Sequence, residues 1–91
     1  MLPESTKSIQ DEAFINTGIE SIYIPTGVLE IGKSSFANCP LLTFIYLPDT
    51  LNTISADAFD GSDHAIIVCT EDSYADQFAA EYHLPAVIIN N

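Results

Sequence analysis

The chain has 91 residues, 47% of them hydrophobic, and carries thirteen acidic side chains against two basic ones, for a formal net charge of −11 at pH 7. This charge repels phosphate backbones and anionic membrane surfaces, so nucleic acid is excluded as a partner. No long apolar run occurs, and no basic segment precedes an apolar one at the start, so we expect neither membrane insertion nor a signal peptide in this stretch.

Three successive segments of the chain are imperfect copies of one unit. Prolines, isoleucines and phenylalanines each recur at spacings of 22 and 23 residues. The three columns are Pro3, Pro25 and Pro48; Ile9, Ile31 and Ile54; and Phe14, Phe36 and Phe59. A period of this length is typical of a solenoid, in which stacked units share one core. The sequence therefore predicts three coils, at about 1–24, 25–47 and 48–69.

Each coil contains a run in which side chains alternate in character, at residues 20–24, 42–47 and 65–69. Alternation predicts a strand, and stacking of the coils places these strands in parallel about 4.8 Å apart. The side chains expected to point inward are Ile22, Ile24, Ile45, Leu47, Ile67 and Cys69. We also expect the three recurring phenylalanines to stack into an internal ladder.

The alternation leaves an apolar row facing outward. Its members are Tyr23, Phe44, Tyr46, Ile66 and Val68. Aromatic side chains on the open face of a rigid sheet are a candidate protein-binding surface. Two alternatives stay open, because cross-strand aromatic pairs also stabilise a sheet, and another region of a longer protein can cover such a row.

The repeat ends after Cys69, and residues 70–91 are expected to form a C-terminal cap. Ala75, Phe78, Ala79 and Tyr82 have the spacing of one helical face, which predicts a helix at about 73–82. A final strand is predicted at about 86–89. Together they would cover the apolar edge of the third coil.

The two cysteines, Cys39 and Cys69, occupy different positions of the repeat. They fall at different points of the coil cross-section and should not stack on each other, whereas a disulfide needs Cα atoms within about 7 Å. We therefore expect two buried thiols. His64 lies in a loop and His83 at a helix end, so neither is expected to activate a thiol. No phosphate-binding loop, zinc-ligand pattern or Ser-His-Asp arrangement is present, and we predict no catalytic residue and no cofactor.

A short acidic loop contains Asp57, Asp60 and Asp63 around Gly61. Carboxylates in one loop are the ligands that calcium prefers, but the spacing is not that of an EF-hand, and Asp-Gly is ordinary turn chemistry. Calcium binding at this loop is therefore only a hypothesis, and no metal ligand is assigned.

The central unit, IPTGVLEIGKSSFANCPLLTFIYLP, resembles the BspA-type leucine-rich repeats of surface-exposed and secreted bacterial proteins. It keeps that family's pattern IP-x-x-V-x-x-IG-x-x-AF-x-x-C, with Ser35 in place of the alanine, while Thr70 replaces the strand-ending proline of the third coil. The resemblance implies an α/β repeat that is mostly β: a right-handed solenoid of about three coils with a C-terminal capping helix. It also implies a protein-interaction or adhesion module, with a host or cell-surface protein as partner.

A passive spacer at the end of a longer solenoid is the alternative function. The chain enters almost directly at a repeat boundary at Pro3, without an atypical polar first coil, so we expect it to be part of a longer protein. The oligomeric state is not predicted, since an open first coil also invites pairing with another copy.

Overall fold

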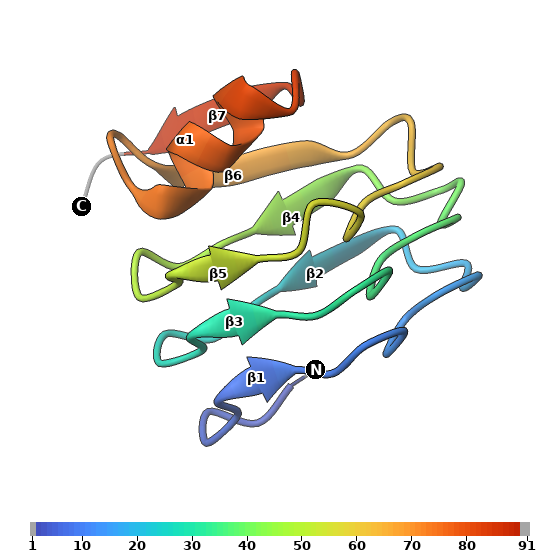
Figure 1. The fold of residues 1–91 in the computed structure, drawn as a ribbon, viewed down its shortest axis with the longest axis horizontal. Helices are drawn as coiled ribbons and strands as arrows, with labels where there is room; N and C mark the ends of the chain where they lie inside the picture. Colours follow the sequence, from blue (N-terminus) through green and yellow to red (C-terminus); the bar gives the residue numbers. More distant parts are fainter. Residues whose placement is uncertain (1, 90–91) are drawn as a thin grey trace.

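The computed structural model describes residues 2–89, which form a short solenoid of parallel strands closed at its C-terminal end by one helix (Figure 1). The molecule measures 31 × 29 × 20 Å along its principal axes. The predicted fold class, a mostly β repeat solenoid with a capping helix, is confirmed.

Two parallel sheets run along the solenoid. The short sheet has the order β1-β3-β5, with strands Ser8–Ile9, Glu30–Ile31 and Thr53–Ile54. The long sheet has the order β2-β4-β6-β7, with strands Ser21–Tyr23, Phe44–Tyr46, Ile66–Thr70 and Ala86–Ile89. The short sheet was not predicted, because its two-residue strands are too short to show an alternating pattern.

The core lies between the two sheets and is filled by the side chains that the alternation placed inside. Ile24, Ile45, Leu47, Ile67 and Cys69 are buried, as are Ile9, Ile31 and Ile54 of the short sheet. Ile22 is only half-buried, because β2 is the edge strand of the long sheet. The predicted division of side chains between the two faces of the strands is therefore confirmed.

The phenylalanine ladder is present at the centre of this core. The rings of Phe14 and Phe36 are stacked with centroids 5.2 Å apart, and those of Phe36 and Phe59 with centroids 5.5 Å apart. Phe78 of the capping helix then meets Phe59 edge-on at 6.2 Å. The cap thus continues the aromatic packing of the coils.

A second column of side chains donates hydrogen bonds to the backbone carbonyls of the residues that carry these rings. The thiol of Cys39 donates to the carbonyl of Phe14 over 3.1 Å, and one coil later the hydroxyl of Ser62 donates to the carbonyl of Phe36 over 2.5 Å. Ser62 also accepts the N–H of Cys39 over 2.9 Å. A small S–H or O–H side chain at this position therefore links each coil to the one before it.

The turn beside this column requires left-handed backbone. Asn16, Asn38 and Gly61, at successive repeats, have φ values of 60°, 55° and 77°. Asparagine and glycine are the residues that adopt this conformation at least cost. The turn signals in the sequence thus have a common backbone cause.

The C-terminal cap covers both sheets of the third coil. Helix α1 spans Tyr74–Glu81, and the hydroxyl of Ser73 caps it by accepting the N–H of Asp76 over 3.2 Å. The hydroxyl of Tyr74 accepts the N–H of Ile54 over 3.2 Å at the edge of β5. Strand β7 pairs in parallel with β6 and covers the edge of the long sheet.

Truncating the central ring of the ladder should destabilise the protein strongly. Phe36 is fully buried between two stacked rings, so we expect Phe36→Ala to lower the free energy of unfolding by about 3–5 kcal/mol. Urea denaturation followed by circular dichroism measures this. Phe44→Ala, at a half-exposed position of the outer face, should cost about 1 kcal/mol or less. Equal losses in the two variants would contradict the ladder as the core.

Two buried serines should respond to alanine in opposite directions. The hydroxyl of Ser62 is bonded at both ends, so Ser62→Ala should lower the free energy of unfolding by about 1–3 kcal/mol. Among the described residues, the hydroxyl of Ser35 has no hydrogen-bond partner and is buried. Ser35→Ala, which places there the alanine found at positions 13 and 58, should raise the free energy of unfolding by about 1 kcal/mol. Thermal denaturation of both variants tests the pair, and destabilisation by Ser35→Ala would be the contradicting result.

Candidate protein-binding face

The outer face of the long sheet brings the predicted apolar row together. The parallel register places Phe44 beside Ile66, and Tyr46 beside both Tyr23 and Val68. These five side chains form two adjacent columns on one surface, which we call the outer face. The geometry expected of the row is present, while its role in binding stays a proposal.

The five side chains of the outer face differ in exposure. Tyr23 is 50% exposed and Phe44 49% exposed, whereas Tyr46, Ile66 and Val68 are half-buried. The rings of Tyr23 and Tyr46 are stacked, with centroids 4.5 Å apart and 15° between their planes. The two tyrosine rings therefore orient each other across the strands.

One member of the outer face was missed in the sequence. Val87 of β7 pairs with Val68, extends its column by one strand and is 45% exposed. The run from Val87 to Ile89 does indicate a strand, but the sequence gives no register between a cap strand and the repeat. The face thus extends onto the cap.

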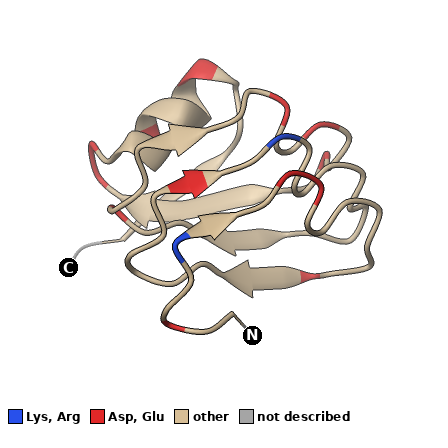
Figure 2. Cartoon of the chain, turned by 60° about the horizontal axis from the view of Figure 1, so that its bottom comes forward, with Lys and Arg blue, Asp and Glu red and all other residues tan. Residues whose placement is uncertain are grey.

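The outer face carries no charged side chain at its strand positions from Ser21 to Ile89 within the described residues. Figure 2 shows that the acidic residues lie mainly in the connections between strands. An uncharged apolar surface is thus bordered by negative charge.

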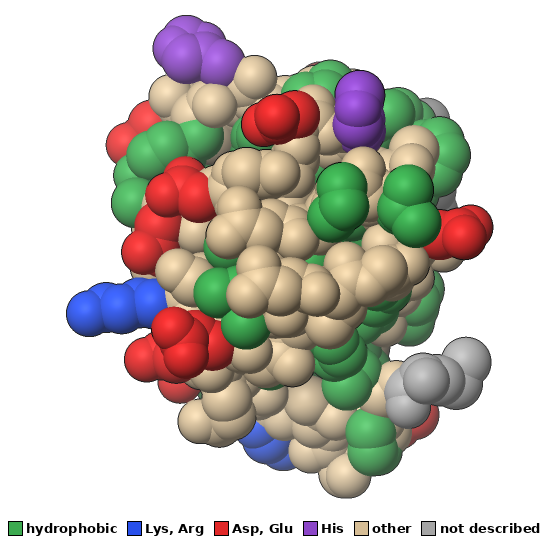
Figure 3. All heavy atoms as spheres, turned by 90° about the vertical axis from the view of Figure 1, so that its right-hand side faces the viewer, with side chains coloured by type: hydrophobic (Ala, Val, Ile, Leu, Met, Phe, Trp, Pro, Cys, Tyr) green, Lys and Arg blue, Asp and Glu red, His purple; other side chains and the backbone are tan. Residues whose placement is uncertain are grey.

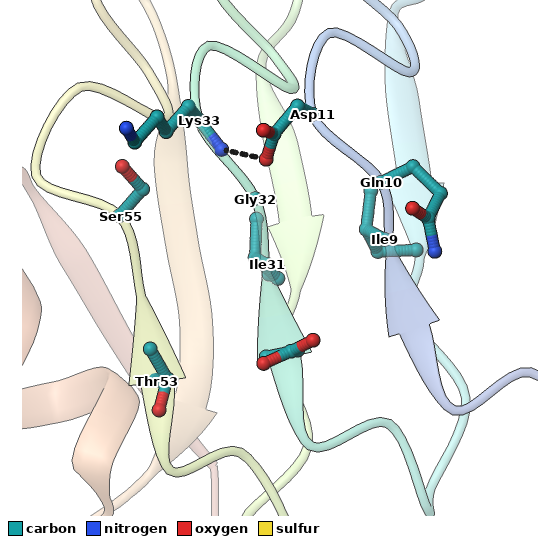
Figure 4. A pocket seen from close by; sticks show the side chains of 9 residues that line it. Ile9, Gln10, Asp11, Ile31, Gly32, Lys33, Thr53 and Ser55 are labelled. Carbon is teal, nitrogen blue, oxygen red and sulfur yellow. Dashed lines mark hydrogen bonds between the residues drawn. The ribbon is translucent and has the colours of Figure 1, made fainter.

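The short sheet offers a different, polar surface. A shallow groove of about 470 Å³ follows it, and its polar lining consists of Gln10, Asp11, Glu30, Lys33, Thr53 and Ser55 (Figure 4). The carboxylate of Asp11 accepts the backbone N–H of Lys33 over 2.9 Å and so links two coils. Asp11 therefore has a structural role in this groove.

The family profile described as "BspA type Leucine rich repeat region (6 copies)" matches residues 1–77. The chain belongs to the BspA-type leucine-rich-repeat family. No curated protein and no solved structure matches the chain. Membership in this family indicates a repeat module for protein interaction, of a kind associated with bacterial surface or secreted proteins.

The acidic loop of this BspA-type chain is partly used by the fold. The carboxylate of Asp57 accepts the hydroxyl of Ser55 over 2.8 Å and the N–H of Ser34, in the preceding coil, over 3.1 Å. These two bonds, that of Ser55 first, lower the pKa of Asp57. Within residues 2–89, no group of three or more histidine, cysteine or acidic side chains is arranged to hold a metal ion.

The cysteines and histidines of the repeat lie in different environments. Cys39 and Cys69 are free and buried, while His64 and His83 are exposed. Figure 3 shows the two histidines at separate places on the surface. Burial raises the pKa of the Cys69 thiol, which lowers its reactivity as a nucleophile. No described helix is long and apolar enough to cross a bilayer.

The bonds of Asp57 should make part of the stability depend on pH. A carboxyl group whose pKa is lowered by folding stabilises the protein above its ordinary pKa of about 3.9, and this contribution is lost as the pH falls through the lower, folded value. The Asp57→Asn variant has no carboxyl group to titrate at this position, so it lacks this contribution to stability. We therefore expect the variant to be less stable than the wild type at pH 6, and the difference to shrink steadily below pH 4.

Urea denaturation at several pH values measures this difference. Asp63→Asn, at an exposed position of the same loop, is the matched control and removes the same unit of charge. If the two variants show the same pH dependence, net charge and not the bonds of Asp57 is responsible.

Proposed function

We propose that this chain is a non-enzymatic protein-binding module whose docking surface is the outer face of the long sheet. The residues that would contact the partner are Tyr23, Phe44, Tyr46, Ile66, Val68 and Val87. The observation that supports this most is the half exposure of Tyr23, Phe44 and Val87 on one rigid, uncharged surface.

The composition of the face matches that of known protein interfaces. Interface centres are enriched in tyrosine and phenylalanine and depleted of charge, and they are surrounded by a polar rim. Here the aromatic columns form the centre, and the acidic connections form the rim. The two-dimensional order of the sheet also limits the entropy that these side chains lose on binding.

In this proposal, the cellular location of the protein and the kind of partner it binds are inferred from its family. BspA-type repeats are associated with bacterial surface or secreted proteins. We therefore assign the chain to a surface-exposed or secreted protein, in which it would serve adhesion to a host or cell-surface protein. The absence of an enzymatic role rests on the same family and on the burial of both thiols.

A passive spacer is the second candidate. Its support is the stacking of Tyr23 on Tyr46, since cross-strand aromatic pairs stabilise a sheet without any partner. The half burial of Ile66 and Val68 is compatible with this role as well. A binding module should retain a specific partner on its outer face from a mixture of proteins, whereas a passive spacer should not.

The double variant Phe44→Ser/Tyr46→Ser separates them. The chain is coupled to beads and exposed to an extract of host cell-surface proteins, and the captured proteins are quantified by mass spectrometry. For a binding module, the double variant should retain a specific partner at least tenfold less than the wild type, because interface aromatics contribute about 2 kcal/mol or more.

Leu29→Ser is the matched control, since Leu29 is 48% exposed but lies ahead of β3 in the short sheet. It should retain the partner like the wild type. A spacer would capture the same proteins in all three forms. Circular dichroism of each variant shows whether the fold is kept.

A further inference from the structure

The connections that border the outer face carry charge of one sign. Within three residues of a strand of the long sheet, the described chain has acidic side chains but no lysine or arginine. The acids in these positions are all exposed, and they are Glu20, Asp49, Asp63, Glu71 and Asp72. The border of this face is therefore negative at neutral pH.

Both lysines of the chain lie beside the other sheet. Lys7 directly precedes β1, and Lys33 lies two residues after β3, where it lines the polar groove of the short sheet (Figure 4). The short sheet thus has side chains of both signs next to it. The negative border of the outer face has no basic side chain beside its strands to offset it.

The acids lie at both ends of the strands that form the outer face. Asp63 precedes β6 and Glu71 directly follows it, and a strand of five residues is about 17 Å long. On the preceding coils, Glu20 directly precedes β2 and Asp49 follows β4. The apolar columns of the face therefore lie between two acidic borders.

The centre of the face is exposed in a strand that has neighbours on both sides. Strand β4 pairs with β2 on one side and with β6 on the other, yet Phe44 is 49% exposed. Its neighbour in β2 is the small Ser21, and its neighbour in β6 is Ile66. The exposure of Phe44 is thus a property of the paired sheet and not of an edge strand.

We propose that the partner of the outer face is a cationic segment of another protein, in which a few apolar side chains are flanked on both sides by lysine or arginine. This inference rests on the proposed binding function of the face and specifies its ligand. The apolar side chains pack on Phe44 and Tyr46, and the flanking cations reach the two acidic borders.

Charge selects this occupant over a second copy of the chain. A second copy seated on the face would bring its own acidic borders against these, and like charges across an interface oppose association. Complementary charge at a border acts mainly on the rate of association, whereas packing at the centre acts mainly on the rate of dissociation. The two parts of the face are therefore separable by kinetics.

A library of random short peptides displayed on phage is the probe. Peptides that bind the chain are selected, and those that also bind Phe44→Ser/Tyr46→Ser are removed. The remaining peptides should carry lysine or arginine on both sides of an apolar stretch. If no selected peptide depends on Phe44 and Tyr46, the proposed function fails, and this inference fails with it. If such peptides are found but are neutral or acidic, only this inference is overturned.

Two variants of equal net charge separate the borders from the charge of the whole chain. The border variant is Glu20→Gln/Asp49→Asn/Asp63→Asn/Glu71→Gln. The control variant, Glu4→Gln/Glu12→Gln/Glu30→Gln/Glu81→Gln, neutralises the same number of exposed acids away from the strands of the long sheet. Circular dichroism shows whether each variant keeps the fold.

Surface plasmon resonance with synthetic copies of the selected peptides measures both rates. At low salt, the border variant should bind the peptides with an association rate about tenfold lower than that of the control variant, and with a similar dissociation rate. High salt should remove the difference, because it screens exposed charges. Equal association rates in the two variants would overturn the proposal. So would a dimer of the free chain in light scattering that Phe44→Ser/Tyr46→Ser dissociates, because a second copy would then fill the face.

Discussion

Stacking of each coil on its neighbour, in one register, is the interaction on which this structure depends. No coil has a core of its own, because each contributes only two short strands and a few buried side chains. Parallel backbone pairing, the stacked rings of Phe14, Phe36 and Phe59, and the Cys39 and Ser62 bonds to the preceding coil all act between coils. They share the 22- to 23-residue spacing, so a change in one column affects the next coil.

This register also shapes the surface that the protein offers to partners. Because parallel strands align equivalent residues, apolar residues in successive coils, such as Tyr23, Tyr46 and Val68, become a continuous column on the outer face. The connections, where the chain leaves the sheets, hold most of the acidic side chains. An apolar face with an acidic border therefore arises from the repeat itself, without a pocket built for one ligand. Such a surface suits recognition of a protein better than chemistry on a small molecule.

The ends of the solenoid matter as much as its faces, since a stack of coils leaves backbone groups unsatisfied at each end. The cap solves this at the C-terminal end with two unlike devices, a side-chain hydroxyl for β5 and a strand for β6. Within the described residues, β7 then forms the last strand of the long sheet, as β2 forms its first.

The sequence by itself determined the period, the inward and outward sides of each main strand, the phenylalanine ladder and the family, because these depend on residue type at a regular spacing. The division into repeats of about 1–24, 25–47 and 48–69 with a cap at 70–91, and binding by the outer face, stay predictions. Only the tertiary structure decided the short sheet, the pairing of Val87 with Val68, the bond from Ile54 to Tyr74 and the hydrogen bonds of Asp57. The contacts of Val87 and Tyr74 join the cap to coils with which it shares no repeat position, and the strands of the short sheet are too short to leave a pattern. Ser34 and Asp57 are one repeat apart, but the spacing alone does not specify a bond between unlike residues.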